Sequence, residues 1–101
     1  MDPVSAIRRA AIEAQVELDR LYAVGAPTTA SALDQAGLRD GIAIVEDYLS
    51  HGEAGVALEH LLYMINESQL QLSAQSRTDV AEVASSLGLF HLIRDRSDET
   101  P

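Results

Sequence analysis

The sequence contains no cysteine and no tryptophan, and every basic residue among its 101 positions is an arginine. Without cysteine, the chain forms no disulfide and offers no thiolate to a metal ion. Aromatic residues make up only 4% of the sequence and apolar residues 47%, so the core must be aliphatic and rich in alanine. Because β-sandwich cores are rich in β-branched and aromatic residues, this composition favours packed helices.

The sequence also lacks long hydrophobic runs. No segment approaches the roughly 20 apolar residues that cross a bilayer. The first residues include Asp2 and contain no apolar run of signal-peptide length. We therefore expect a cytoplasmic protein without a membrane partner. Its length predicts one helical domain over residues 1–93, followed by a disordered polar tail over residues 94–101.

Positive charge is scarce, and it is unevenly distributed. The formal net charge is −9, and the stretch from Asp40 to Ser76 holds six acids and no arginine. Such a surface repels nucleic acid and anionic lipid and attracts a basic macromolecule. The alternative interpretation is that the charge only keeps a small protein soluble.

The first helix is predicted from Asp2-Pro3, where an N-cap residue precedes a proline at the first helical position. Gly25-Ala26-Pro27 ends it. Its apolar residues recur at spacings of three and four, at Val4, Ile7, Ala11, Ala14, Leu18 and Leu21. This pattern predicts one helix of an antiparallel bundle, although a homodimer through the Met1–Tyr22 helix is also possible.

A connector over Thr28–Gly37 leads to a second helix over Leu38–Ser50, which His51-Gly52 closes. The immediate start of a third helix, over Glu53–Glu67, predicts an antiparallel hairpin. One arc of the third helix is apolar and predicts a core face, formed by Ala54, Ala57, Leu58, Leu61, Leu62, Met64 and Ile65. The opposite half carries acids, a histidine and a tyrosine.

Ser73 is the expected N-cap of a fourth helix. Its apolar side consists of Val80, Val83, Ala84 and Leu87, and Gly88 ends it. Four apolar residues that follow are expected to fold back onto the bundle, namely Leu89, Phe90, Leu92 and Ile93. The predicted fold is therefore an all-α, four-helix up-and-down bundle with an acidic central helical hairpin.

Motifs for chemistry are absent from the sequence. No Glu-x-x-His pair of a di-metal bundle and no His-Glu-x-x-His motif occurs, and no phosphate-binding glycine loop or activated serine is present. We therefore expect no metal site, no cofactor and no enzyme activity. The stretch Asp79–Phe90 is similar to the first helix and turn of a helix-turn-helix reader, which leaves a small dimeric regulatory or scaffold protein as the alternative.

A more specific pattern covers residues 45–89, where polar residues recur at fixed offsets. It contains His51-Gly52-Glu53, Gly55, and the run AlaLeuGluHisLeu over residues 57–61, followed by Glu67, Ser73 and Gly88-Leu89. In these residues the chain resembles the Maf immunity family. Members of that family are small proteins encoded with polymorphic toxins, and they neutralise the C-terminal domain of the toxin.

The resemblance implies a stoichiometric inhibitor whose partner is a basic C-terminal toxin domain, most readily a nuclease. It implies no binding of nucleic acid by this chain. Such a partner agrees with the acidic hairpin, because a nuclease must be basic to hold phosphates. The candidate partner-binding residues are the polar residues of the hairpin, namely Glu46, Asp47, His51, Glu53, Glu59, His60, Tyr63, Asn66 and Glu67.

Overall fold

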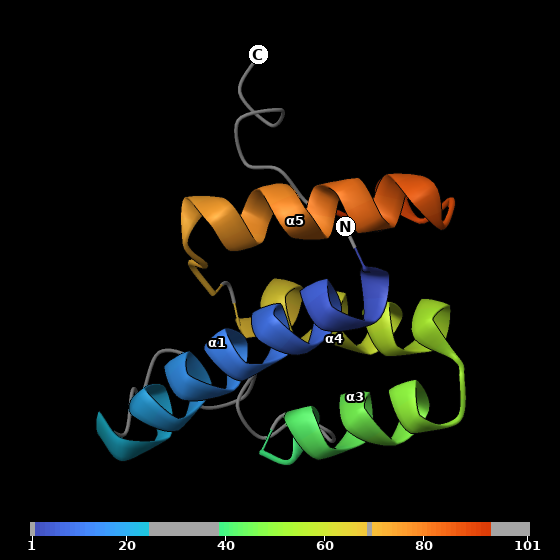
Figure 1. Ribbon diagram of the computed structural model, residues 1–101. Helices are drawn as coiled ribbons and strands as arrows, with labels where there is room; N and C mark the ends of the chain where they lie inside the picture. Colours follow the sequence, from blue (N-terminus) through green and yellow to red (C-terminus); the bar gives the residue numbers. More distant parts are fainter. Residues whose placement is uncertain (1, 25–38, 69, 94–101) are drawn as a thin grey trace.

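The computed structural model describes residues 2–24, 39–68 and 70–93. These residues form four α-helices, one 3₁₀ turn and no strand, which confirms the predicted all-α class (Figure 1). The elements are α1 (Pro3–Val24), α3 (Gly41–Ser50), α4 (Ala54–Ser68), α5 (Ala74–Ser86) and η2 (Phe90–Leu92). The predicted connector over Thr28–Gly37 and the predicted tail over residues 94–101 lie outside the described residues.

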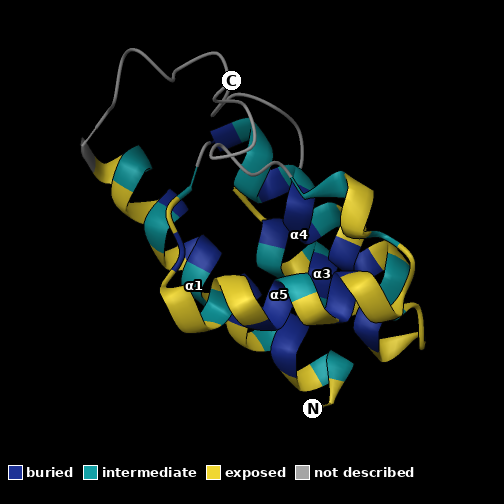
Figure 2. Cartoon of the chain, turned by 90° about the horizontal axis from the view of Figure 1, so that it is seen from above, coloured by how far each residue is buried: buried dark blue, intermediate teal, exposed yellow. Residues whose placement is uncertain are grey.

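Helix α1 contacts each of the other three helices, and consecutive helices run in alternating directions (Figure 1). The hairpin of α3 and α4 packs on one side of α1, and α5 packs on the other. Each of the four helices carries both buried and more exposed residues, and the buried ones are dark blue in Figure 2. The up-and-down bundle is therefore built around α1.

The start of α1 is fixed as the sequence predicts. The Asp2 carboxylate accepts hydrogen bonds from the backbone N–H of Val4, at 3.3 Å, and from the hydroxyl of Ser5, at 2.8 Å. The bond from Val4 satisfies a backbone N–H that has no partner within the first turn of a helix.

The buried face of α1 is wider than the predicted stripe. The stripe residues Ile7, Ala11, Ala14 and Leu18 are buried, but Ala6 and Ala10 are buried as well. The reason is that α1 packs against three helices, and its alanines allow the neighbouring backbones to approach closely. The apolar stripe of α1 therefore packs against the other helices of the same chain. Ile12 and Val16, on the opposite face of α1, are exposed.

Helix α3 begins at Gly41, three residues later than predicted, because Arg39 and Asp40 form a turn. The buried side chain of Gln15 in α1 fixes this start. Its amide nitrogen donates to the carbonyl of Arg39 at 3.2 Å, and its amide oxygen accepts from the N–H of Ile42 at 3.0 Å. A buried side chain of a distant helix therefore sets a boundary that local sequence does not indicate.

The turn between α3 and α4 is the predicted glycine stop. Gly52 has φ +72°, a left-handed conformation that favours glycine. The N–H of Glu53 donates to the carbonyl of Tyr48 at 2.9 Å, and that of Gly52 donates to Leu49 at 3.1 Å. This is the Schellman arrangement. Because α4 starts at the next residue, the two helices form a tight hairpin.

The predicted apolar arc of α4 faces the core. Ala57, Leu58, Leu61, Leu62 and Met64 are buried, and Ala54 and Ile65 are partly buried against them. Met64 packs on Gly41 so closely that a methyl group at position 41 would lie 2.5 Å from the Met64 sulfur. The absence of a side chain at Gly41 therefore lets α3 approach α4.

Helix α5 starts at its predicted cap, since the Ser73 hydroxyl accepts from the N–H of Ser76 at 3.2 Å. A second contact reinforces this end: the Glu13 carboxylate of α1 accepts from the N–H and hydroxyl of Ser73 and from the hydroxyl of Ser76. A negative charge near a helix N-terminus is favourable. Glu13 thus connects α1 to the start of α5.

Glu13 should make folding sensitive to acid. Burial raises the pKa of Glu13, but the hydrogen bonds from Ser76 and Ser73 outweigh it, so the pKa lies below the ordinary value of 4.5. A lowered pKa stabilises the fold above the unfolded-state pKa, and this contribution is lost as pH falls through the folded-state value. We expect Glu13→Gln to lower the free energy of unfolding at pH 7 by roughly 1–2 kcal/mol.

Urea unfolding of both proteins between pH 7 and pH 3 tests this expectation. The difference between wild type and Glu13→Gln should shrink as pH falls below 4.5, because wild type then loses the same interaction. Glu82→Gln, at an exposed acid of α5, is the matched control and should leave stability unchanged. A difference that stays constant with pH would contradict a role for the Glu13 charge.

Candidate interaction surface

Four of the predicted partner-binding residues lie on one face of α4, and a fifth immediately precedes that helix. Successive helical residues are rotated by about 100°, so the buried arc of α4 fixes which residues point away from it. The half opposite that arc, which we call the outer face of α4, carries Glu59, His60, Tyr63 and Glu67, with Glu53 just before its start. Helix α4 therefore presents these five residues on one side of the molecule.

The outer face is acidic and partly aromatic. Glu53 and Glu59 are exposed, while Glu67, His60 and Tyr63 are partly buried. The rings of His60 and Tyr63 lie 5.5 Å apart, centroid to centroid, and are tilted by 39°. Paired rings lose little conformational freedom when a partner covers them, so this arrangement suits a contact surface.

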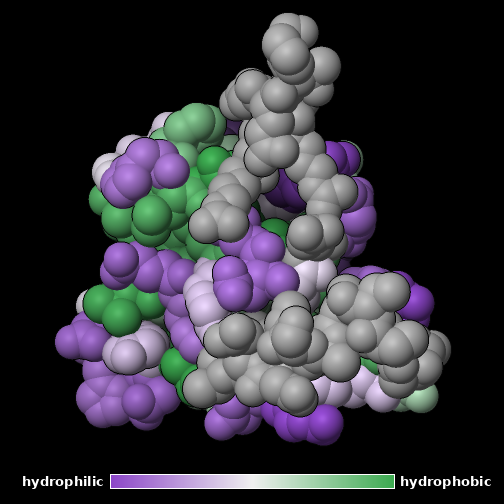
Figure 3. Space-filling model, turned by 180° about the vertical axis from the view of Figure 1, so that it is seen from behind, coloured by the Kyte–Doolittle hydropathy of each residue, from purple (hydrophilic) through white to green (hydrophobic). Residues whose placement is uncertain are grey.

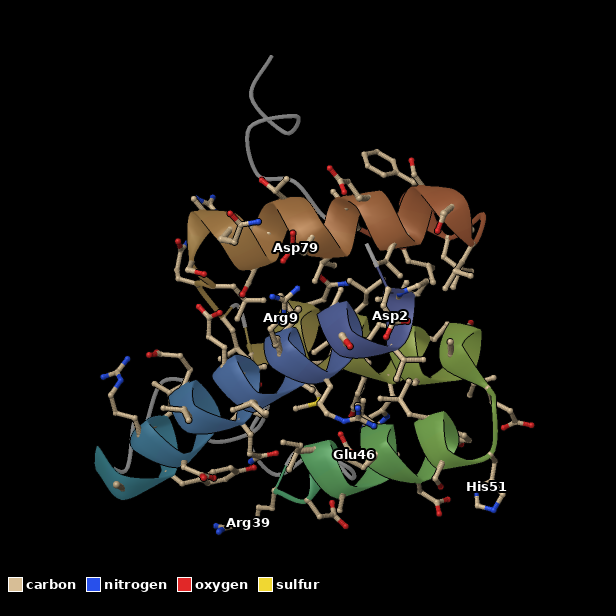
Figure 4. The ribbon with its side chains drawn as sticks, in the orientation of Figure 1. Asp2, Arg9, Arg39, Glu46, His51 and Asp79 are labelled. Atoms are coloured by element: carbon tan, nitrogen blue, oxygen red, sulfur yellow. The ribbon has the colours of Figure 1, made fainter. Side chains whose placement is uncertain are left out.

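His51 lies where α3 turns into α4 (Figure 4), and Asp47 lies in the last turn of α3. The His51 ring nitrogen Nδ1 lies 2.7 Å from the carbonyl oxygen of Asp47 and donates to it when protonated. This hydrogen bond, the Asp47 carboxylate at 3.7 Å and the charge of Glu53 raise the pKa of His51. Both side chains are exposed, so the Asp47 carboxylate extends the acidic surface to the hairpin turn, with His51 beside it.

Glu46 lies on another side of the molecule. It points toward α1, where its carboxylate pairs with Arg8 at 2.6 Å (Figure 4). Residues 40–76 contain no arginine. In the folded protein, however, Arg8 of α1 lies against this segment and pairs with one of its acids. Both side chains remain close to half exposed, so the pair adds little to stability. The structure separates Glu46 from the five residues of the outer face.

Asn66 is engaged within the chain. Its amide nitrogen donates to the carbonyl of Leu92 in η2, at 3.1 Å. This bond lies at the edge of the outer face and fixes the segment after α5 against α4. Asn66 therefore positions a neighbouring element, a role that its sequence position alone does not reveal.

Two exposed apolar residues near this surface, Val56 and Phe90, were not among the predicted contact residues. Val56 lies on the polar half of α4, and this angular position in the sequence could have indicated that its side chain is exposed. Phe90 was predicted to pack on the bundle, and this prediction is wrong, since its side chain points to solvent. Leu87, predicted as a core residue of α5, is also exposed. The other three residues of the predicted return segment, Leu89, Leu92 and Ile93, do pack against the core.

Three further features bear on function. Among residues 2–24, 39–68 and 70–93, no group of three or more metal-ligating side chains is close enough to hold an ion. No helix in the same ranges has the length and apolar character needed to span a bilayer. After the turn that follows α5, where a helix-turn-helix protein would place its recognition helix, the described residues form only the three-residue turn η2.

Comparison with protein-family models, with curated proteins and with solved structures finds no match to this chain.

Proposed function

We propose that this protein is an immunity protein that binds a basic bacterial toxin domain and neutralises it stoichiometrically. The toxin domain is of the nuclease class, and the protein carries out no chemistry of its own. The observation that carries the proposal is the outer face of α4, where Glu53, Glu59 and Glu67 share one surface with the paired rings of His60 and Tyr63.

The placement of the arginines supports a basic partner. Arg8 pairs with Glu46 and Arg9 with Asp79, in both cases from α1, whereas Arg20 pairs with Glu17 along the same helix. None of these three pairs involves a carboxylate of the outer face of α4. Among the described residues, these arginines are thus engaged elsewhere, which favours a contact between that face and a cationic surface.

The proposed mechanism is occlusion. A nuclease holds phosphates with a basic cleft, and an acidic helical hairpin is attracted to the same cleft. Complementary charge raises association rates to about 10⁸–10⁹ M⁻¹s⁻¹ at low salt. Once docked, the hairpin blocks or flanks the cleft, so the nucleic acid no longer reaches it.

Co-purification tests this proposal. The tagged protein is purified at low salt from its native host, and mass spectrometry identifies what accompanies it. We expect one large secreted protein that ends in a compact basic domain. Expression of that domain alone should stop growth of a test strain, and co-expression of this protein should restore growth.

Two outcomes would contradict the proposal. Recovery of the protein alone, or with DNA-associated factors, would favour the dimeric regulator suggested by the Asp79–Phe90 segment. A basic partner whose toxicity is unaffected by co-expression would show binding without immunity. Affinity that does not change between low and high salt would contradict the electrostatic part of the mechanism.

A further inference from the structure

A group of apolar side chains is exposed where α5 ends. Phe90 is 54% exposed and Leu87 38%, and Val56 at the start of α4 is 39% exposed. From behind, apolar side chains gather over the end of α5 and the residues beside it (Figure 3). Most large apolar side chains of the described residues are buried or partly buried, so those that are exposed are informative.

The backbone explains why Phe90 points outward. Gly88 has φ +74°, and the N–H of Leu89 donates to the carbonyl of Ala84 at 2.7 Å, which ends α5 and reverses the chain. Leu89 then packs beside Gly55 of α4, and Asn66 holds the carbonyl of Leu92.

Residues three apart lie on the same side of a 3₁₀ turn. Because Leu89 and Leu92 both face the core, Phe90 is directed to solvent. Its exposure is thus a consequence of two fixed neighbours.

This apolar group adjoins the acidic outer face. Around α4, Gly55 and Asn66 mark the side that contacts the segment after α5. Glu59 comes next in angular order, followed by Tyr63 and then Val56. Glu59 therefore lies between that segment and Val56. Glu53 lies one turn before Val56, so carboxylates flank the apolar side chains.

We infer that Phe90, Leu87 and Val56 form an apolar anchor site that receives an aromatic or aliphatic side chain at the centre of a basic protein surface. The inference rests on the proposed function, and it identifies the residues that slow dissociation of the complex with the toxin domain. A second copy of this chain is a poorer occupant, because each copy has a formal net charge of −9 and docking would bring the flanking acids together.

The anchor and the acids have different tasks. Carboxylates at the rim of an interface mainly speed association, whereas a buried aromatic contact slows dissociation. Loss of Phe90 should therefore weaken binding through a faster dissociation rate, with little change in salt dependence. We expect a reduction in affinity of roughly ten- to a hundredfold, as for other central anchors.

Two synthetic peptides test the anchor before any toxin is identified. Both contain the same number of arginines separated by glycines, and in one of them central glycines are replaced by tryptophan. Each is titrated into the full chain while backbone amide resonances are followed by NMR. Both should shift amides of the outer face of α4, but only the tryptophan peptide should shift the Leu87–Leu92 amides.

We expect the tryptophan peptide to bind about tenfold more tightly than the other. Phe90→Ser should remove that advantage, and Leu87→Ser should reduce it. Val16→Ser, at an exposed apolar residue of α1, is the control and should leave it intact. Equal affinity of the two peptides for wild type would overturn the inference, as would an advantage that persists in Phe90→Ser and Leu87→Ser.

The inference and the proposed function fail in different experiments. If the peptides behave as expected but co-purification yields no toxin, the anchor stands and the immunity function falls. If a toxin is recovered and Phe90→Ser binds it with unchanged affinity and dissociation rate, the immunity function stands and the anchor falls. The amide spectrum of each variant establishes that the fold is retained.

Discussion

Replacing Glu59 and Glu67 by arginine is expected to abolish protection against the toxin while leaving the helical fold intact. Both residues lie on the outer face of α4, and their reversal places positive charge against a basic partner. Like charges brought together across an interface cost several kcal/mol, which weakens binding by at least about a hundredfold. Growth of the co-expressing strain and the Kd measured by titration calorimetry report the loss.

The matched control reverses Glu17 and Glu82, which changes the net charge by the same amount away from that face. Control and wild type should bind alike at moderate salt. The defect of the Glu59/Glu67 variant should also shrink as salt screens the charges. Equal loss of protection in both variants would assign the effect to net charge. Loss of helical circular dichroism would make Glu59 and Glu67 structural residues.

Leu18→Ala is expected to give the largest loss of stability from a single change on α1. Its side chain is fully buried, at 0% exposure, on the helix that contacts all the others. Truncation leaves a cavity and removes apolar contacts, which costs about 2–5 kcal/mol. Small domains are stable by only about 5–15 kcal/mol, so the variant should unfold at much lower urea concentration and temperature.

Val16→Ala on the same helix is the control, because the Val16 side chain is 61% exposed. Alanine also has the higher helix propensity, so stability should stay within about 0.5 kcal/mol of wild type. Urea unfolding monitored by circular dichroism compares the two variants. If Val16→Ala proves as destabilising as Leu18→Ala, the outer side of α1 is covered in solution, as in a dimer through this helix.

Local signals in the sequence predicted the helices well. Asp2-Pro3, Gly52, Ser73 and Gly88 each act where they were expected, because caps and left-handed glycines depend on hydrogen bonds between residues close in the chain. The start of α3 was predicted three residues early. Its boundary depends on Gln15 of a distant helix, which no local pattern reveals.

The candidate surface was predicted in part. Periodicity placed Glu59, His60, Tyr63 and Glu67 together, because residues on one helix keep fixed relative angles in any fold. The same reasoning could not place Glu46 against Arg8, since that pairing depends on how α1 crosses the hairpin. Periodicity also could not predict that Phe90 is exposed, because its direction is set by the contacts that Leu89 and Leu92 make with α4.

The sequence by itself thus determined an all-α chain with its helix ends, its hairpin turn and one acidic helix face. These follow from composition, capping and angular spacing, which act over a few residues. Only the tertiary structure decided which surfaces remain available. It buried Ala6 and Ala10 because α1 meets three helices, and it left Phe90 exposed where α5 ends. Burial depends on packing between residues far apart in the chain, and periodicity within one helix does not contain that information.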